Sequence, residues 1–328
     1  FLVGGILAIK DKKIILLFII TMLVVPNFLY FTQQKILNPK IIFQKETDYY
    51  NARVIDAYLP AYGNARILAL DFDFHSIETK KVVEYYPEIY PIFANLKTNI
   101  KNILVIGAGA YTLPKHFKNY YKDADVSVVE LDPEIINIGN DFFDLKKYNI
   151  KTIVGDAKIV INKNKEKYDV IFGDAYNSFI SVPWYLLTEE WNNEIKEKLN
   201  ENGIYAINFI GSLSGSKSEF TNSVLSTFKI SFPNFYIFAF GKNPEYTQSI
   251  TLVGVNGRLP ISEGELSKKL LIGENSFLAN KIIPVMYFKD STSIILTDNF
   301  SPVEKLMEST IKSYFPKNLF EFKSILSI

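Results

Sequence analysis

The sequence predicts an α/β protein built on a parallel sheet with crossover helices. Between Lys101 and Asn177, short apolar runs each end in Gly, Asp or Glu, and helix-like sequence follows each of them. Apolar runs that alternate with helical segments are typical of parallel strands buried on both faces. Ligands of such sheets bind beyond the carboxyl ends of the strands, where these Gly and acidic residues fall. The stretch therefore predicts a nucleotide-type pocket.

Residues that follow the strands define the corners of this pocket. Gly107 and Gly109 form the turn after the first strand, where glycine lets the backbone approach a ligand and the next helix offers free N–H groups. Glu130 ends the second strand, where a carboxylate can accept both hydroxyls of a ribose. Asp156, followed by Ala157, ends the third strand and is suited to accept from an adenine amino group.

Asp174 ends the fourth strand and is expected to point at whatever reacts. Each corner also has a plainer explanation, because a lone GxG is often only a turn and an Asp after a strand is often a helix N-cap. Four corners in register are much harder to obtain by accident. We therefore expect a true pocket.

Composition narrows the classes of function. The chain has 328 residues, 48% hydrophobic content and a net charge of +1, which allows one large or two ordinary domains and indicates no nucleic-acid partner. It has no cysteine and only two histidines, His75 and His116, too few for the usual zinc site or His-based triad. We expect no metal, and chemistry that depends on carboxylates, tyrosines and a bound cofactor.

Residues 1–31 are predicted to form one or more membrane segments. Phe1–Ile9 is apolar, a polar break with three lysines follows, and Ile14–Phe31 is a mostly apolar run close to the roughly 20 residues of a span. Pro26 and Asn27 weaken its second half, and a signal peptide is the rival interpretation. The apolar stretch ahead of the lysines fits the tail of a preceding span better, so we expect a membrane-anchored protein. Lysines flank both sides and leave the orientation open.

Residues 41–99 are expected to form a small N-terminal β-hairpin domain. Tyr50–Ala57 and Arg66–Phe74 alternate in polarity on either side of Pro60 and Gly63, which predicts a hairpin. Glu84–Leu96 is interrupted by prolines and is expected to be a short helix or a pair of turns. This layer either covers one end of the sheet or forms a wall over the pocket.

Residues 100–304 are predicted to form a Rossmann-like catalytic domain, with 305–328 as a C-terminal tail. After the fourth strand the pattern predicts a helix, a strand, a second helix and an antiparallel hairpin. A parallel sheet that ends in such a hairpin is usual for S-adenosylmethionine-methyltransferase-like folds, whereas a plain dinucleotide fold lacks it. The expected elements are Thr188–Asn200, Gly203–Ile210, Ser218–Phe228 and the hairpin strands Asn234–Phe240 and Ser249–Val255.

Several blocks in order give the chain a resemblance to a known family. They are Tyr50-Asn51 with Val54, ARILALDFDFHS, GAGA, VELDPEI, GDA, GDAY, the segment from Val182 to Glu190, and LTDNFSPVE. The chain resembles the spermidine synthase (polyamine aminopropyltransferase) family, most closely the branch fused behind membrane spans, from roughly Tyr50 to Glu304. The resemblance implies decarboxylated S-adenosylmethionine as donor, an amine acceptor and methylthioadenosine as by-product. Because that donor is cytosolic, the soluble domain is expected on the cytoplasmic side, and a homodimer fits the family.

The resemblance also implies a role for each corner. Asp174 would be the catalytic acid–base residue, and Tyr176 would orient the amine or simply line the pocket. Asn51 takes the place of a family glutamine that touches the donor. His75 stands where members often have Gln in the donor wall, although a hydrogen-bonded structural histidine fits as well. The remaining donor residues are Glu130 for the ribose, Asp156 with Ala157 for the adenine, and Gly107 and Gly109 beneath the donor.

A carboxylate at Asp174 suits amine chemistry. An alkylamine with a pKa near ~10.4 is mostly protonated at neutral pH, and freeing its lone pair costs about 1.36 kcal/mol per pH unit, roughly 4–5 kcal/mol in all. A carboxylate beside it can bind the ammonium, accept the proton and aim the nitrogen at the carbon next to the sulfonium.

The sequence also departs from the family. Ala110 stands where polyamine-making members have Asp, Asn177 replaces an acidic residue, and their Tyr-His-Glu block is not recognisable in Glu84–Tyr90. Because burying an unpaired ammonium costs several kcal/mol, these departures make putrescine a less suitable acceptor.

Other functions on the same fold stay open. An S-adenosylmethionine-dependent methyltransferase would need a basic group near the glycine loop, where Lys115 is the nearby candidate but is expected to be a solvated helix residue. A nucleoside-binding membrane protein with an altered site needs no catalysis. A nicotinamide oxidoreductase is disfavoured by the missing third glycine and by the GDA and GDAY corners.

Overall fold

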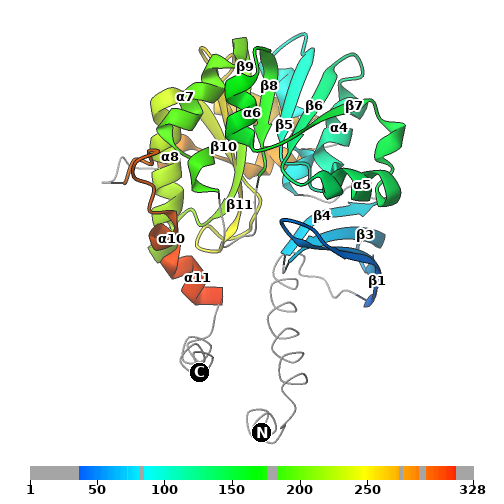
Figure 1. Ribbon diagram of the computed structural model, residues 1–328. Helices are drawn as coiled ribbons and strands as arrows, with labels where there is room; N and C mark the ends of the chain where they lie inside the picture. The colour runs from blue at the N-terminus through cyan, green and yellow to red at the C-terminus, as the bar shows by residue number, and fades with distance from the viewer. Residues whose placement is uncertain are drawn as a thin grey trace, which may run out of the picture. The chain divides into compact units, whose positions relative to one another are not determined.

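The computed structural model describes residues 37–71, 73–80, 85–175, 183–272, 276–287 and 293–314. The chain divides into two compact units, Phe1–Val83 and Glu84–Ile328 (Figure 1). The predicted division at residues 99 and 100 stays a prediction. Tyr176, Asn177 and the expected membrane segment lie outside the described residues.

The first unit is an antiparallel sheet of four strands in the order β1-β2-β3-β4. The predicted hairpin is confirmed as β2 and β3, which turn at Gly63 with φ at 84°. The expected strand Arg66–Phe74 is interrupted, because Asp71 adopts a left-handed φ of 52° and its carboxylate accepts the Asn51 N–H at 2.9 Å. The strands are β1 (Leu37–Glu46), β2 (Asn51–Leu59), β3 (Gly63–Leu70) and β4 (Asp73–Thr79).

The second unit contains a mixed sheet of eight strands in the order β12-β10-β11-β9-β8-β5-β6-β7. The strands from β7 to β9 in this order run parallel, and the chain moves outward from β5 through β6 to β7 before it returns to β8 beside β5. The order therefore reverses between β5 and β8, which is where open α/β sheets bind ligands. The parallel strands are β5 (Asn102–Ile106), β6 (Asp125–Glu130), β7 (Ile150–Val154), β8 (Tyr168–Gly173) and β9 (Leu199–Gly211).

An antiparallel hairpin ends the sheet as predicted. It consists of β10 (Phe235–Ala239) and β11 (Gln248–Val255), and β11 pairs with β9 so that the hairpin is inserted beside the parallel strands. A short strand, β12 (Ile282–Ile283), extends the edge. The α/β fold with a mixed sheet is thus confirmed.

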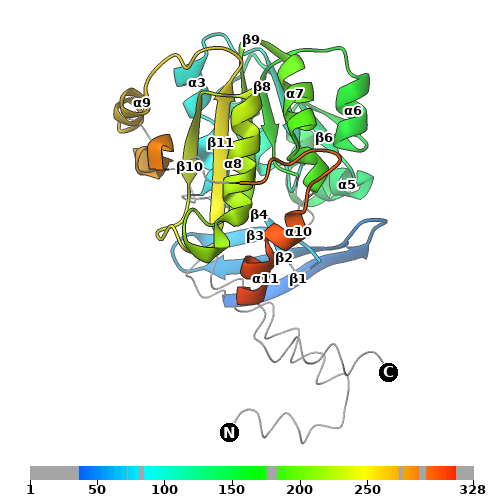
Figure 2. The ribbon, with the colours of Figure 1, turned by 90° about the vertical axis from the view of Figure 1, so that its left-hand side faces the viewer.

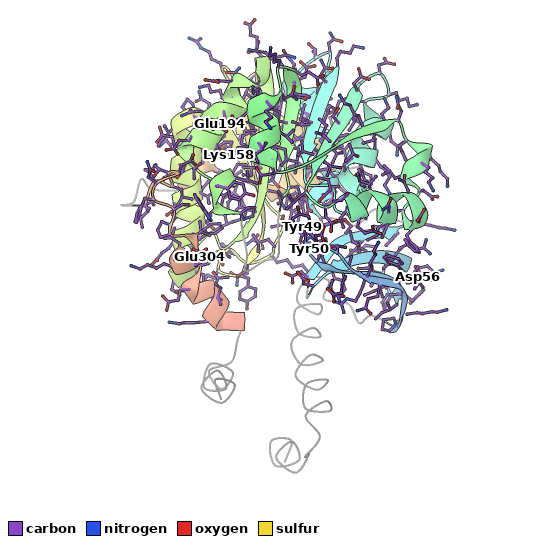
Figure 3. All side chains as sticks on the ribbon, in the orientation of Figure 1. Tyr49, Tyr50, Asp56, Lys158, Glu194 and Glu304 are labelled. Atoms are coloured by element: carbon purple, nitrogen blue, oxygen red, sulfur yellow. The ribbon has the colours of Figure 1, made fainter. Side chains whose placement is uncertain are left out.

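Helices cover both faces of this sheet. On one face α6 (Ala157–Lys163), α7 (Glu189–Glu197) and α8 (Glu219–Ser231) pack on a large apolar core (Figure 2). Lys158 of α6 and Glu194 of α7 lie close together on this layer (Figure 3). Figures 1 and 2 also show the other helices, α3 (Ile92–Leu96), α4 (Thr112–Tyr120), α5 (Pro133–Phe142), α9 (Glu263–Leu270), α10 (Val303–Leu306) and α11 (Glu308–Tyr314).

Aromatic rings of α3 and α4 pack against the opposite face of the eight-stranded sheet. The rings of Phe93 and Phe117 stack with their centroids 5.6 Å apart, and both meet Phe172 of β8 edge-on. Such pairs add stability beyond the apolar area that they bury. The predicted pair of turns over Glu84–Leu96 is confirmed as the 3-10 helix η1 (Tyr86–Ile89) followed by α3.

The predicted membrane anchoring has to be corrected. Within the described residues no helix is long and apolar enough to cross a membrane, and residues 1–31 lie outside them. Pro26 and Asn27 interrupt the apolar run, and the part before them, Ile14–Val25, falls short of the roughly 20 apolar residues of a span. The expectation of a membrane-anchored protein is therefore withdrawn.

Candidate active site

Gly107 lies where the ends of β5 and β8 meet. Its φ is 92°, and a Cβ added there would stand 2.4 Å from the Asp174 carbonyl oxygen, so only glycine fits. The Gly107 N–H donates to the Val129 carbonyl at 2.9 Å, and the Asp174 N–H donates to the Ile106 carbonyl at 2.8 Å. Gly109 also has a positive φ, of 49°. These contacts bring the glycine loop directly beside Asp174.

The Glu130 carboxylate is buried and is held by the backbone of two turns. Its Oε2 accepts the Ala108 N–H at 2.9 Å, and its Oε1 accepts the Asp132 N–H at 2.9 Å. Burial raises the pKa of Glu130, although these backbone N–H groups oppose the rise. Each carboxylate oxygen has a second lone pair, so two hydroxyl donors can still be accepted.

Asp156 uses its two oxygens for different partners. Oδ1 caps α6 by accepting the Ile159 N–H at 3.1 Å, so the helix-cap explanation holds for this atom. Oδ2 accepts from the Tyr185 hydroxyl at 2.9 Å. Ala157, buried, begins α6 beside it.

Asp174 is partly buried and is held by side chains from two distant elements. Its Oδ2 accepts from the Tyr86 hydroxyl at 2.8 Å, and its Oδ1 accepts from Asn208 Nδ2 at 3.1 Å. The side-chain oxygen of Asn208, Oδ1, accepts from Ser249 Oγ at 2.6 Å and from Thr251 Oγ1 at 3.3 Å. The side-chain nitrogen, Nδ2, must therefore face Asp174. Burial raises the pKa of Asp174 to about 6, and the two hydrogen bonds oppose this rise.

Tyr86 and Asn208 were missed by the sequence prediction. Tyr86 and Glu88 lie on either side of Pro87 in this chain, and the expectation that the family's Tyr-His-Glu block is not recognisable there stays a prediction. Tyr86 stands beside Tyr85 and near Tyr90, and nothing in the sequence distinguishes it from them. For Asn208 the signal was a single amide within the apolar strand IYAINFI.

A close pair of side chains, Glu88 of η1 and His116 of α4, joins these two helices. His116 Nδ1 of α4 lies 3.6 Å from Glu88 Oε1, and the Tyr90 ring meets the His116 ring edge-on at 5.2 Å. Burial raises the pKa of Glu88 to about 7 and lowers the pKa of His116 to about 4. Burial thus favours the neutral form of each group.

Lys115 is not the solvated residue that the sequence suggested. It is buried, and its Nζ donates to the Phe143 carbonyl at 2.8 Å. A lysine bound to the carbonyl at the end of α5 gives no support to a carboxylate-binding role at the glycine loop. The methyltransferase alternative loses the basic group on which it depended.

An apolar hollow lies beside Asp174 at the ends of β5, β8 and β9. The hollow is small, with a cavity volume of about 20 Å³, close to what one water molecule needs. Its polar lining includes the Asn208 amide, and the Trp191 indole at its wall is fixed by donating to the Tyr205 hydroxyl at 3.1 Å. Apolar lining residues include Ile106, Pro183, Leu186 and Leu187.

Asn51 and His75 belong to the first unit and are described there by themselves. The Asn51 amide donates to Glu46 and accepts from Gln44 Nε2 at 3.1 Å, which ties it to β1. His75 Nε2 is buried without a hydrogen-bond partner among the described residues, and burial lowers the His75 pKa to about 4. Their roles toward a donor stay predictions.

No cluster of three or more His, Asp or Glu side chains in the described part of the chain is arranged to hold a metal ion. The chain has no cysteine to add to such a cluster.

Comparison with known proteins adds to this geometry. The model of the spermine/spermidine synthase domain matches residues 84–256, more than half of the chain. The chain belongs to the spermine/spermidine synthase family. Its curated relatives include polyamine aminopropyltransferases, and the chain is accordingly a transferase.

Two of these relatives and one solved structure show how far the similarity extends. The polyamine aminopropyltransferase of Vibrio vulnificus is 27% identical over 241 residues, which cover 68% of this chain and 76% of its own. That of Thermococcus kodakarensis is 25% identical and covers 69% of this chain and 80% of its own. The structure of a probable spermidine synthase from Corynebacterium glutamicum superposes with a TM-score of 0.62 at 17% identity, covering 80% of this chain and 98% of that chain. This structural likeness supports the fold.

Proposed function

We propose that this family member transfers an aminopropyl group from decarboxylated S-adenosylmethionine to an amine, with release of methylthioadenosine. The observation that carries the proposal is the Asp174 carboxylate, which sits at the reversal of strand order with donors from Tyr86 and Asn208. The family membership and the named activity of the curated relatives support it.

Asp174 is proposed as the acid–base residue. With a pKa near 6 it is ionised at neutral pH and can still accept a proton from a bound ammonium. The freed nitrogen lone pair forms a bond to the methylene carbon next to the sulfonium, the carbon–sulfur bond breaks, and its electron pair goes to sulfur. Methylthioadenosine leaves, and Asp174 passes its proton to solvent.

The hydrogen bonds to Asp174 serve two purposes in this scheme. The Tyr86 hydroxyl and the Asn208 amide stabilise the ionised carboxylate and fix its plane, so that it can aim the nitrogen. Neither partner carries a charge that would compete with the ammonium for the carboxylate.

The donor is proposed to lie across the neighbouring strand ends. Glu130 would accept both ribose hydroxyls through its remaining lone pairs. Asp156 and Ala157 would receive the adenine, and Gly107 and Gly109 would pass beneath the donor.

The acceptor is proposed to differ from putrescine. Ala110 is buried in the glycine loop and supplies no counter-charge for a second ammonium. An amine whose far end is apolar or only weakly charged would avoid that cost.

Methylthioadenosine release tests the proposal. The full chain would be incubated with decarboxylated S-adenosylmethionine and a panel of monoamines, diamines and polyamines, with the nucleoside product quantified by liquid chromatography. We expect amine-dependent methylthioadenosine release. Turnover of intact S-adenosylmethionine to S-adenosylhomocysteine would instead establish a methyltransferase, and a chain that neither reacts with the donor nor binds methylthioadenosine would contradict the pocket itself.

A further inference from the structure

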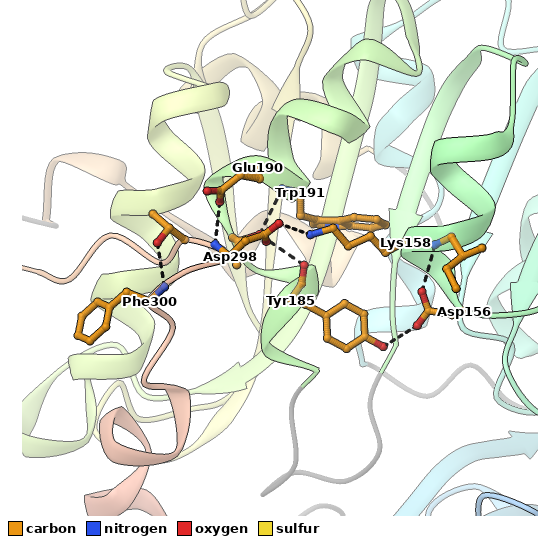
Figure 4. Close-up of polar contacts among 10 residues, drawn as sticks. Asp156, Lys158, Tyr185, Glu190, Trp191, Asp298 and Phe300 are labelled. Atoms are coloured by element: carbon orange, nitrogen blue, oxygen red, sulfur yellow. Dashed lines mark hydrogen bonds and ion pairs between the residues drawn. The ribbon is translucent and has the colours of Figure 1, made fainter.

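The Tyr185 hydroxyl is hydrogen-bonded to the Asp156 carboxylate, the group that is proposed to bind the adenine. Tyr185 lies in the 3-10 helix η3 (Trp184–Leu186), and its hydroxyl donates to Asp156 Oδ2 at 2.9 Å (Figure 4). The other Asp156 oxygen accepts the N–H that caps α6, so Tyr185 donates to the oxygen that the cap leaves available. Burial raises the pKa of Tyr185 to about 12, so the phenol keeps its proton and acts as a donor at neutral pH.

Asp298 holds the elements on both sides of this contact, as Figure 4 shows. Its carboxylate pairs with Lys158 in the first turn of α6 and accepts from Thr188 Oγ1 at 2.8 Å. Its N–H donates to Glu190 Oε2 at 3.0 Å. Thr188 caps α7 two residues after the end of η3. Rotation of the Tyr185 side chain alone would break its bond to Asp156.

We propose that Tyr185 is a specificity-determining residue of the donor site, whose hydroxyl takes the place of the adenine 6-amino group on Asp156 when no nucleoside is bound. The inference rests on the proposed function, because it takes the Asp156 corner as the adenine site. Both groups are N–H or O–H donors that seek the same carboxylate oxygen. A nucleoside with a 6-amino group replaces the lost bond when it displaces Tyr185, whereas a 6-oxo purine presents an acceptor and cannot.

The competition between Tyr185 and the adenine for Asp156 predicts the direction in which the affinity for methylthioadenosine changes. In wild-type protein an adenine nucleoside must break the Tyr185 bond before it can form its own, so part of its binding free energy is offset. Tyr185→Phe keeps the ring and removes only the donor. This variant is expected to bind methylthioadenosine about three- to ten-fold more tightly, the effect of about one net hydrogen bond. If Tyr185 instead helped to orient Asp156, the same change would weaken binding.

Calorimetric titration of the full chain with methylthioadenosine tests this sign. Tyr168→Phe is the matched control, because the Tyr168 hydroxyl contacts Asn164 and Glu166 at the start of β8, away from the strand ends that form the site. We expect tighter binding in Tyr185→Phe, unchanged binding in Tyr168→Phe, and weak binding of 5′-methylthioinosine to wild-type protein.

A second measurement needs no variant of Tyr185. The Trp184 ring meets the Tyr185 ring edge-on at 5.9 Å, so movement of Tyr185 changes the surroundings of this indole. Methylthioadenosine is expected to change the tryptophan fluorescence of wild-type protein, and Trp184→Phe identifies the share that belongs to this residue.

The outcomes separate the two proposals. Equal or weaker binding by Tyr185→Phe, while the wild type binds, overturns the inference and leaves the proposed function standing. An unaltered Trp184 signal on saturation also overturns it. If neither wild type nor Tyr185→Phe binds methylthioadenosine, the proposed function fails and the inference fails with it.

Discussion

Glu130 and Asp174 are carboxylates at the same edge of one sheet, but the protein holds them in different ways. Glu130 accepts backbone N–H groups from the turns next to its own strand and the neighbouring strand. Asp174 accepts from the side chains of Tyr86 and Asn208, which come from η1 and β9. Backbone donors give a fixed carboxylate suited to binding. At Asp174 burial raises the pKa and the side-chain donors oppose that rise, which suits the proposed proton transfer.

The largest expected effect on activity is that of a substitution at Asp174. Asp174→Asn removes the proposed proton acceptor, and we expect kcat to fall about 10³-fold, within the range of general acid–base catalysis. Methylthioadenosine should bind as before. Steady-state rates and calorimetry on the same preparation measure both quantities.

Asp169→Asn is the matched control at the other end of the same strand. The Asp169 carboxylate accepts the Lys101 and Asn102 N–H groups at 2.8 and 3.1 Å, so this change should lower the melting temperature and leave kcat nearly unaltered. Full activity in Asp174→Asn would remove the assigned role from that residue.

A smaller effect is expected at the binding corner. Glu130→Gln turns an amino group toward one of two buried N–H donors, which leaves an unpaired donor at a cost of about 1–3 kcal/mol of stability. The affinity for methylthioadenosine should fall at least about 10-fold, as measured by calorimetry. Glu201→Gln, at an exposed site at the start of β9, should change neither property. Wild-type affinity in Glu130→Gln would show that the ribose is bound elsewhere.

The smallest effect concerns stability alone. The pKa of Glu88 is about 7 in the folded chain and 4.5 ordinarily, so its stabilising neutral form is fully present below pH 4.5 and is lost as the pH rises through 7. Glu88→Gln cannot ionise. The variant should therefore gain stability over wild type between pH 5 and pH 8, by about 1–2 kcal/mol after allowance for partial solvent screening.

Thermal melts across this pH range check the Glu88 prediction. His116 titrates in both proteins, so its contribution largely cancels from the comparison. A stability difference that does not vary with pH would mean that Glu88 is already neutral, or already ionised, throughout the range.

Local sequence was enough to place the carboxylates of the site. Gly107 and Asp174 directly follow β5 and β8, Glu130 ends β6, and Asp156 lies two residues past β7; parallel strands bring these carboxyl ends to one edge. The hairpin at the end of the sheet was predicted for the same reason, because its strands carry their own pattern and turn.

The hydrogen-bond partners of Asp174 could be identified only from the folded structure. Tyr86 and Asn208 lie 88 and 34 positions away from it in the chain, and no local pattern shows that η1 and β9 meet there. The same limit applies to Tyr185, which reaches Asp156 across 29 positions. The membrane prediction counted apolar residues locally in residues 1–31, and no helix among the described residues is long and apolar enough to support it. The homodimer and the roles of Asn51, His75 and Tyr176 stay predictions.

The most direct test of the account is the pH dependence of methylthioadenosine release at saturating donor and amine, in wild type and in Tyr86→Phe. The wild-type rate should rise through a midpoint near pH 6 as Asp174 ionises. Loss of the Tyr86 hydrogen bond removes a group that stabilises the ionised form, so the midpoint of Tyr86→Phe should move to higher pH. The titration of the amine, near pH ~10, is common to both proteins. A wild-type profile without a step near pH 6, or a midpoint that Tyr86→Phe leaves in place, would contradict the assignment of Asp174 as the proton acceptor.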